Sequence, residues 1–185
     1  RVLVVGASGG IGPAIVQLAS RHVGATVSGV CGTARLAYVR SLGATLVIDY
    51  TREDVVDRSE TYDVIIDVLG KSTFAKYRRI LAPQGRLVFL SFKLKQILQM
   101  LWTAVLGGRR VVCMLVNEKP DDLVFIKSLI EAGKTSSVVD KAFHLQQAAQ
   151  GTQVRRERGE DGSSGLTVPC SPDPSGLLGS RRATS

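Results

Sequence analysis

The sequence has few cysteines, histidines and aromatic residues, and these shortages exclude several classes of protein. Its three cysteines lie far apart without a C-x-x-C pair, which argues against a disulfide framework and indicates reduced thiols in a cytoplasmic compartment. Only two histidines are present, His22 and His144, and they are also far apart. We therefore expect no metal site.

Long apolar runs and concentrated basic patches are missing as well. The run "LQMLWTAVLGG" is too short to span a bilayer and is followed by arginines, so we expect no stable membrane insertion. We expect no secretory signal, because the first apolar segment runs directly into glycines. The net charge is +8, but the basic residues are scattered and aromatics make up only 5%, so we expect no nucleic-acid partner.

What is present, up to about residue 150, is an alternation of short apolar runs with amphipathic segments. The apolar runs predict strands at 2–5, 25–31, 45–50, 62–70, 85–92 and 109–116. Helices are predicted at 11–21, 34–43, 72–81, 94–106 and 120–134. This order predicts an α/β fold over residues 1–150, a doubly wound and mainly parallel Rossmann-type sheet with helices on both faces.

Three local patterns refine this prediction. In the first helix, an apolar stripe is expected to comprise Ile11, Ile15, Leu18 and Ala19. Residues 82–85, "APQG", are typical of a turn before the fifth strand. The last helix should place Leu123, Ile126 and Ile130 on one face and end at a C-cap glycine, Gly133.

Residues 151–185 have neither helical nor strand periodicity and are rich in Gly, Ser, Pro and Arg, so we expect a disordered, irregular tail. One hypothesis is that this tail is translated out of frame. Reading the codons of "TQVRRERGEDG" one base later permits "HRYVESGEKTG", which would continue the preceding pattern as a helix. Sequencing the encoding DNA would decide between this frameshift near residues 150–151 and a native tail.

A glycine-rich turn joins the first strand to the first helix. Gly6, Gly9 and Gly12 are spaced G-x-x-G-x-x-G, with Ala7 where the usual dinucleotide-binding spacing has a glycine. Gly6 permits a tight turn, Gly9 a close approach of the backbone to a pyrophosphate, and Gly12 close packing of helix on strand. The positive helix end would then face the phosphates.

The segment after the second strand bears on coenzyme choice. An NAD-binding site of this type carries Asp or Glu there, whereas this sequence has Thr33 and Arg35, with Arg40 one turn later. A hydroxyl and a guanidinium suit a 2′-phosphate, so NADPH is favoured and NAD is less expected. Arg40 is expected to be a solvated helix residue.

Two families share a turn such as "GASGGIG". Short-chain dehydrogenases need a Tyr-x-x-x-Lys pair, and none of the four tyrosines has a lysine at that spacing. In contrast, "GASGGIGPAIVQLAS", "VRSLGATLVIDYTRED", "YDVIIDVLG", "LAPQGRLV" and "IEAGK" together resemble the cofactor domain of medium-chain dehydrogenase/reductases. The closest resemblance is to the zinc-free quinone oxidoreductase (zeta-crystallin-like) branch, over about residues 1–150.

The resemblance implies a set of cofactor-binding residues. The pyrophosphate would meet the glycine turn, comprising Gly6, Ala7, Ser8, Gly9, Gly10, Ile11 and Gly12. The adenosine would lie by Gly32, Thr33, Arg35 and Tyr50. The nicotinamide and its ribose would lie by Val68, Leu69, Gly70, Ser91 and Phe92. Each of these segments follows a strand, where ligands of open parallel sheets bind.

The resemblance also implies an activity, hydride transfer from NADPH to a quinone, enone or aldehyde, for which the cofactor carries the chemistry. We nominate no catalytic residue; Asp49 and Asp67 end strands without a supporting motif. The alternative is a non-catalytic nucleotide-sensing or interaction module with the same fold, in which the helix containing Trp102 would be a partner or membrane-facing surface.

By the same resemblance, an N-terminal substrate-binding domain would precede Arg1. The chain would then be an inactive fragment of an enzyme that dimerises when full length.

Overall fold

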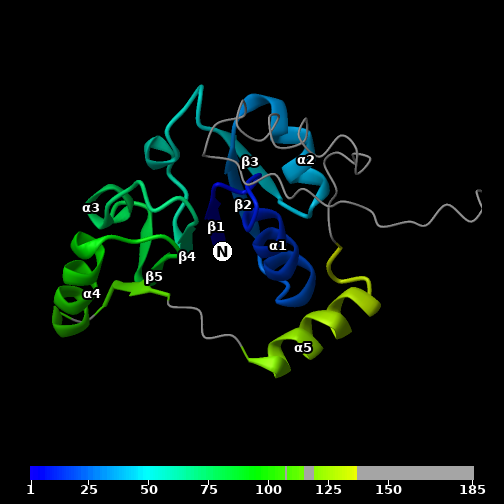
Figure 1. The fold of residues 1–185 in the computed structure, drawn as a ribbon. Coiled ribbons are helices and arrows are strands. Elements are labelled where there is room, and N and C mark those ends of the chain that lie inside the picture. The colour runs from blue at the N-terminus through cyan, green and yellow to red at the C-terminus, as the bar shows by residue number, and fades with distance from the viewer. Residues whose placement is uncertain (107, 115–118, 137–185) are drawn as a thin grey trace, which may run out of the picture.

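Six parallel strands form the centre of the fold (Figure 1). The computed structural model describes residues 1–106, 108–114 and 119–136. The strands are β1 (Val2–Val5), β2 (Val27–Cys31), β3 (Leu46–Asp49), β4 (Tyr62–Asp67), β5 (Leu81–Phe89) and β6 (Arg110–Cys113). Every strand pair is parallel and the spatial order is β3-β2-β1-β4-β5-β6, which confirms the predicted doubly wound sheet.

Strand β1 lies at the point where the strand order reverses. Its last residue, Val5, pairs with Val30 of β2 on one side and Asp67 of β4 on the other. The chain therefore leaves β1 between two strands whose following helices cover opposite faces. Such a reversal opens a crevice at the carboxyl ends of the strands, where this class of sheet binds its ligands.

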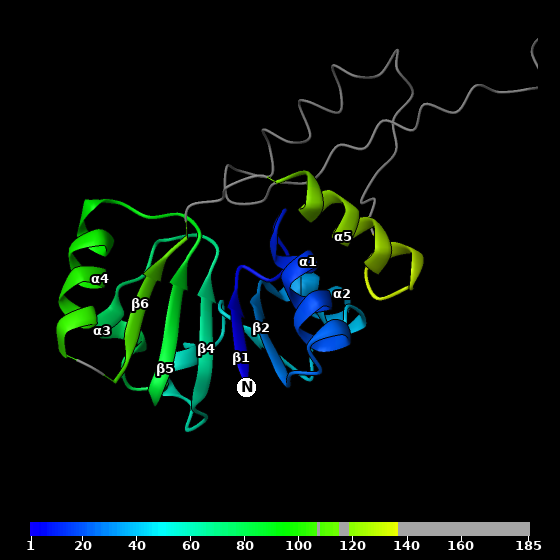
Figure 2. The ribbon, with the colours of Figure 1, turned by 90° about the horizontal axis from the view of Figure 1, so that it is seen from below.

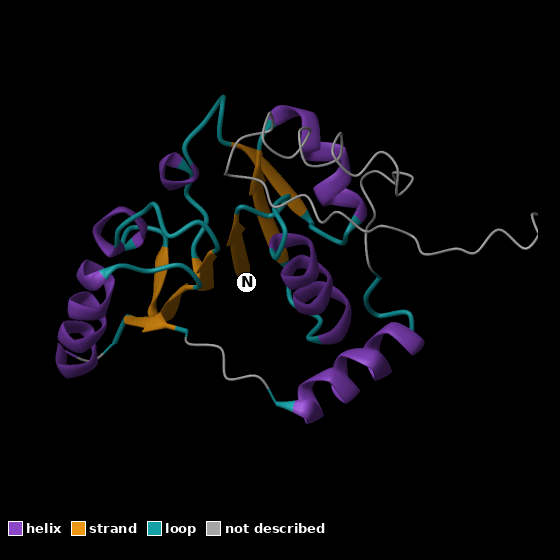
Figure 3. Ribbon diagram, viewed as in Figure 1, coloured by secondary structure: helices purple, strands orange, loops and turns teal. Residues whose placement is uncertain are grey.

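Helices cover both faces of the sheet, as Figure 2 shows from a second direction and Figure 3 by type of structure. One face carries α1 (Gly12–Gln17), continued by a π-helical turn (Leu18–His22), and α2 (Leu36–Ser41), preceded by a 3-10 turn (Thr33–Arg35). The other carries α3 (Phe74–Tyr77) and α4 (Leu94–Leu106), with a 3-10 turn (Val55–Asp57) before β4. Helix α5 (Pro120–Glu131) lies beside α1.

The core is divided by the sheet into two layers. Under α3 and α4, the fully buried side chains include Leu3, Ile65, Leu87 and Phe89. Under α1 and α2, the layer is made of smaller residues, among them Val4, Ala7, Val16, Val27 and Val39. Small side chains allow α1 and α2 to approach the sheet closely, which draws the glycine turn against the strand ends.

Three sequence predictions about local structure need correction. Residues 82–85 are not a turn before β5 but part of it; the register shifts between the Tyr62–Leu81 and Val64–Arg86 pairs, so a bulge absorbs the extra residues. The predicted helix 72–81 shortens to α3, because β5 already begins at Leu81.

Ile11 is also not part of a buried stripe. It precedes α1 as the N-cap residue and is 53% exposed, while Val16 and Gln17 are the buried side chains of this helix.

Helix α5 forms as predicted, and Gly133 ends it with φ of +68°. The face with Leu123, Ile126 and Ile130 is nevertheless exposed, and Leu129 is the buried residue of the helix. What holds α5 near α1 is largely polar: Gln17 Oε1 accepts from Ser136 N at 3.0 Å, and Gln17 Nε2 donates to Ser136 O at 3.2 Å.

The predictions for residues 137–185, including the tail and its frameshift, lie outside the described residues. In the described part of the chain, no helix combines the length and apolar character needed to cross a membrane.

Candidate functional site

The turn after β1 has the backbone geometry that its glycines predict. Gly6 has φ of +85°, in the left-handed region that favours glycine. A Cβ at Gly12 would stand 2.2 Å from the carbonyl oxygen of Gly6, so no larger residue fits at the start of α1. The start of α1 therefore packs closely against Gly6 and Ala7, directly after β1.

The amides of this turn divide into two sets. Gly6 and Ala7 donate to the Val30 carbonyl at 3.2 and 3.0 Å, and Gly9 donates to the Gly6 carbonyl at 3.1 Å. Within the described residues, the other three non-proline amides before α1 have no hydrogen-bond acceptor, namely those of Ser8, Gly10 and Ile11. Unpaired amides at a helix N-terminus are the donors that a diphosphate needs, so this turn fits a dinucleotide.

The loop after β4 packs directly on the glycine turn. A Cβ at Gly6 would lie 3.2 Å from Leu69 Cγ and 3.5 Å from Val68 Cβ, which places the two loops in contact. Gly70 turns the chain with φ of +64°. The structure thus brings residues 6–12 and 68–70 together, as the expected site requires.

Asp67 organises this second loop from beneath. Its Oδ1 atom accepts from the amides of Leu69 at 3.0 Å and Gly70 at 2.9 Å, which fixes the reversal of the chain. The side chain is 1% exposed, and Oδ2 has no hydrogen-bond partner in the described structure. Burial raises the pKa of Asp67, against the lowering effect of its backbone hydrogen bonds.

The loop after β5 completes the inner part of the site. A Cβ at Gly70 would stand 1.9 Å from the Ser91 carbonyl oxygen, so the loops after β4 and β5 touch. Gln96, at the start of α4, donates from Nε2 to the Gly70 carbonyl at 3.4 Å. Ser91 is exposed, whereas Phe92 is half-buried and packs on the core, so Phe92 also has a structural role.

The outer part of the site is built at the ends of β2 and β3. Thr33 Oγ1 donates to Asp49 Oδ2 at 2.5 Å, and Thr51 donates to Asp49 Oδ1 from its backbone N at 3.0 Å and from Oγ1 at 2.7 Å. Tyr50 stands beside Gly32, with its hydroxyl 3.5 Å from the position of a Cβ there. The hydrogen bond from Thr33, followed by those from Thr51, lowers the pKa of Asp49.

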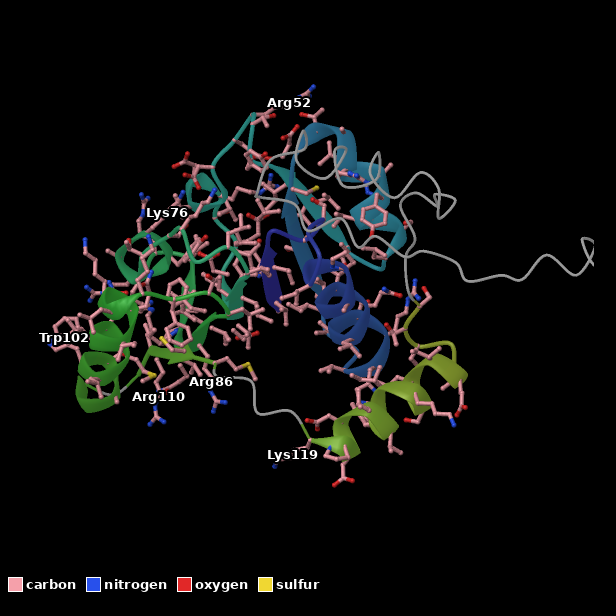
Figure 4. All side chains as sticks on the ribbon, viewed as in Figure 1. Arg52, Lys76, Arg86, Trp102, Arg110 and Lys119 are labelled. Carbon is pink, nitrogen blue, oxygen red and sulfur yellow. The ribbon has the colours of Figure 1, made fainter. Side chains whose placement is uncertain are left out.

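Arginines surround this outer part. The Arg35 guanidinium lies 5.8 Å from the centroid of the Tyr38 ring. Arg52 projects from the loop after β3, with Nε 3.6 Å from Asp49 Oδ2 (Figure 4). Arg40 is an exposed residue of α2, as predicted.

Sequence reasoning saw Asp49 and Asp67 only as acids at strand ends. A local signal could have revealed their roles. Each carboxylate accepts hydrogen bonds from backbone N–H groups two or three residues further along the chain.

Other chemistry is sparse. Among the described residues, no group of three or more His, Cys, Asp or Glu side chains is placed to hold a metal ion. Burial, with a smaller effect of nearby Asp49, raises the pKa of the Cys31 thiol to about 11, so this cysteine is a protonated core residue at neutral pH.

Parallel strands in this order, with a glycine turn at the reversal, define a dinucleotide-binding domain of the Rossmann type. The family model of zinc-binding dehydrogenases matches residues 42–162. The chain belongs to this family, as the cofactor-binding domain of a medium-chain dehydrogenase/reductase of the quinone oxidoreductase branch, and the family resemblance seen in the sequence is confirmed.

Named relatives agree with this membership. An NADPH-dependent alkenal/one oxidoreductase of Arabidopsis thaliana is 34% identical over 140 residues, covering 75% of this chain and 32% of the relative. A quinone-oxidoreductase QR1 of Triphysaria versicolor is 31% identical over 157 residues, covering 80% and 46%. A 2-methylene-furan-3-one reductase of Solanum lycopersicum is 36% identical over 140 residues, covering 75% and 32%. The chain thus spans about a third to a half of the length of these curated relatives.

Solved structures show the same fold. The quinone oxidoreductase of Coxiella burnetii matches with a TM-score of 0.70 at 24% identity, covering 84% of this chain and 49% of that one. The quinone oxidoreductase of Pseudomonas syringae matches with a TM-score of 0.65 at 23% identity, covering 88% and 55%.

Proposed function

We propose that this chain holds NADPH for an oxidoreductase that transfers hydride to a quinone, enone or aldehyde. The observation that carries the proposal is the set of unpaired amides of Ser8, Gly10 and Ile11, at the point where the strand order reverses. The relatives named for quinone, alkenal and furanone substrates support the small-molecule class. The coenzyme supplies the hydride, and the protein orients it and excludes water.

Each part of the site then has a separate task. Residues 6–12 would bind the diphosphate, and residues 32–35 with Tyr50 would bind the adenosine. Val68, Leu69 and Gly70 would hold the nicotinamide ribose, and Ser91 with Phe92 would border the ring. Asp67 acts as a positioning residue, because its carboxylate holds the amides of Leu69 and Gly70.

Coenzyme preference is best assigned to Arg35. The Thr33 and Thr51 hydroxyl hydrogens both go to the Asp49 carboxylate, so Thr33 has no hydrogen left to donate to a 2′-phosphate. A guanidinium is always protonated and binds phosphate strongly. The relative named as an NAD-dependent alcohol dehydrogenase shows that both coenzymes occur among similar proteins, so this preference needs a direct test.

The test compares Arg35→Ala with Arg40→Ala in titrations with NADPH and NADH. We expect R35A to weaken NADPH binding by about tenfold, the order of a lost charge-assisted hydrogen bond, with NADH affected less than about twofold. R40A removes an exposed arginine of the adjoining helix α2 and should change neither affinity. Equal losses for both coenzymes in R35A, or tighter NADH binding by the unmutated chain, would contradict the assignment.

The activity itself is tested by oxidation of NADPH with quinone and enone acceptors, in the protein with whatever further domain its gene encodes. Coenzyme binding without turnover of any acceptor would favour a nucleotide-sensing module instead. An N-terminal substrate domain, a homodimer and a cytoplasmic location belong to the same proposal. The buried Cys31 and half-buried Cys113, which form no disulfide, are compatible with a reducing compartment.

A further inference from the structure

Helix α4 exposes several large apolar side chains: Leu94 is 70% exposed, Leu98 58%, Leu101 58% and Trp102 62%. On the side that faces the protein, Met100 packs against the core, but the buried side chains are the polar ones of Gln96, 7% exposed, and Thr103, 3% exposed. A helix on the surface of a soluble domain normally shows the opposite arrangement. We call Leu94, Leu98, Leu101 and Trp102 the α4 stripe.

Hydrogen bonds at both ends of α4 hold this orientation. Near the start, Gln96 Oε1 accepts from Lys93 N at 2.9 Å, and Nε2 donates to the Gly70 carbonyl. Near the end, Thr103 Oγ1 accepts from Val111 N of β6 at 3.1 Å and donates to the Gln99 carbonyl at 2.9 Å. Turning the α4 stripe inward would break the two bonds that join α4 to other elements, from Gln96 to the Gly70 carbonyl and from Val111 N to Thr103, so its exposure is built into the fold.

The surroundings of the stripe are basic. From Val68 to Asn117 the sequence has no Asp or Glu, and it holds Lys71, Lys76, Arg78, Arg79, Arg86, Lys93, Lys95, Arg109 and Arg110. The exposed Lys93 directly precedes α4, and the exposed Lys95 lies in its first turn. The charge of Lys76 is offset from outside this segment, since its Nζ lies 2.6 Å from Asp54 Oδ2. In Figures 1 and 2, α4 lies at the outer end of the molecule, and Figure 4 shows Trp102 on its outer side.

We propose that the α4 stripe rests on an anionic lipid bilayer, with α4 lying in the plane of the interface. Leucines would enter the boundary between headgroups and acyl chains, and Trp102 suits the headgroup level. Lys93 and Lys95 would contact anionic headgroups. The helix spans 13 residues, too few to cross a bilayer, so the contact is peripheral.

Two comparisons within the chain favour lipid as the occupant. Helix α5 also exposes apolar residues, but Asp121, Asp122 and Glu131 lie on it, and an anionic surface would repel them. A second copy docked in parallel through its own α4 stripe would set Lys93 and Lys95 against identical charges, which is unfavourable. An antiparallel copy would avoid this repulsion, and the test below distinguishes it as a concentration-dependent dimer.

Trp102 is the only tryptophan of the chain, so its fluorescence reports on the stripe directly. The full chain is titrated with vesicles of equimolar phosphatidylcholine and phosphatidylglycerol, and with vesicles of phosphatidylcholine alone. We expect a blue shift and co-sedimentation with the anionic vesicles only, weakened by added salt. L98D/L101D should lower the partition coefficient by about tenfold or more, since each leucine loses its apolar transfer. The matched variant L123D/V124D on α5 should bind as the unmutated chain does.

Several results would overturn the proposal. These are no emission shift, equal binding to neutral vesicles, an equal loss in L123D/V124D, or a concentration-dependent dimer that L98D/L101D abolishes without vesicle binding. If L98D/L101D does not show a cooperative melt, lipids brominated along their acyl chains decide with the unmutated protein. Quenching of Trp102 supports the proposal, and absence of quenching overturns it.

Discussion

At the scale of single residues, the site depends on two buried carboxylates with opposite electrostatics. Asp49 satisfies both oxygens with Thr33 and Thr51, and its pKa falls. Asp67 holds two amides with one oxygen and leaves the other unpartnered, and burial raises its pKa. The first is stabilised in its charged form at the ends of β2 and β3, whereas burial disfavours the charged form of the second, which shapes a loop.

The direction of the Asp67 pKa shift predicts how stability depends on pH. The pKa of Asp67 in the folded state lies above its unfolded value of about 3.8. The folded state therefore binds the proton more tightly, and the contribution of Asp67 to the free energy of unfolding rises as pH falls from the raised pKa to about 3.8. Asp67→Asn should remove that component of the pH dependence.

At neutral pH we expect Asp67→Ala to lower the free energy of unfolding by about 1–3 kcal/mol, because the Leu69 and Gly70 amides lose their acceptor. D67N keeps an acceptor oxygen and should cost less.

Urea unfolding of the three proteins between about pH 4 and pH 7 measures this. Identical pH slopes for D67N and the unmutated chain would show that Asp67 does not titrate differently on folding. A D67A variant as stable as D67N would show that the carboxylate does not support the loop.

The glycine turn could be predicted from residue types, because only glycine fits the backbone conformation and the close contacts of such a turn. The 2.2 Å approach at Gly12 and the positive φ of Gly6 follow from spacing alone. The pairing of Thr33 with Asp49 joins the ends of two different strands, so sequence spacing gives no sign of it. Asp49, as a competing acceptor for the Thr33 hydroxyl, becomes visible only in three dimensions.

At the scale of elements, α5 is attached by hydrogen bonds more than by apolar packing. Gln17 is 1% exposed and bonds to the Ser136 backbone and side chain, while most of the apolar residues of α5 stay exposed. The attachment therefore depends largely on Gln17, assisted by buried Leu129 and by an edge-to-face contact between the His22 and Phe125 rings, whose centroids lie 5.5 Å apart. Elements with few buried apolar contacts open at low free energy.

We predict that Gln17→Leu increases hydrogen exchange in residues 119–136 by about tenfold or more, while amides of β1, β4 and β5 keep their protection. Leucine preserves the buried volume but cannot bond to Ser136. Gln84→Leu, at an exposed position of β5, serves as the control substitution. A uniform rise in exchange over the whole sheet in Q17L would mean that Gln17 supports global stability instead.

Helices and strands were predictable where periodicity was strong, and α4 begins and ends at the predicted residues. The error at residues 82–85 has a physical reason. Pro83 and Gly85 are typical of turns, but β4 and β5 pair on both sides of them, so the sheet absorbs the segment as a bulge. The exposure of the α4 stripe could not be predicted either, because amphipathic spacing does not say which face meets the protein.

At the scale of the whole molecule, the alternation of strands and helices predicted a doubly wound, mainly parallel sheet, and the motifs along the chain indicated the family; the strand order itself comes from the structure. The strand order places the glycine turn between β2 and β4, and the loops after β4 and β5 close against it. The arrangement of the site is therefore a consequence of topology more than of any one side chain. Its central claim is that a dinucleotide binds on residues 6–12.

The most direct test is a calorimetric titration of the 185-residue chain with NADPH and NADH, comparing Gly9→Ala and Gly24→Ala. A Cβ at Gly9 would stand 3.4 Å from the Gly6 carbonyl oxygen at an ordinary φ, so G9A should fold and yet obstruct the approach of the diphosphate. Gly24 has φ of +74° and no heavy atom within 4 Å of an added Cβ, so G24A should lose some stability but no affinity. We predict heat with at least NADPH in the unmutated chain and in G24A, and about tenfold or greater weakening in G9A. Absence of heat with both coenzymes in the folded unmutated chain, or equal affinity of G9A, would contradict the account.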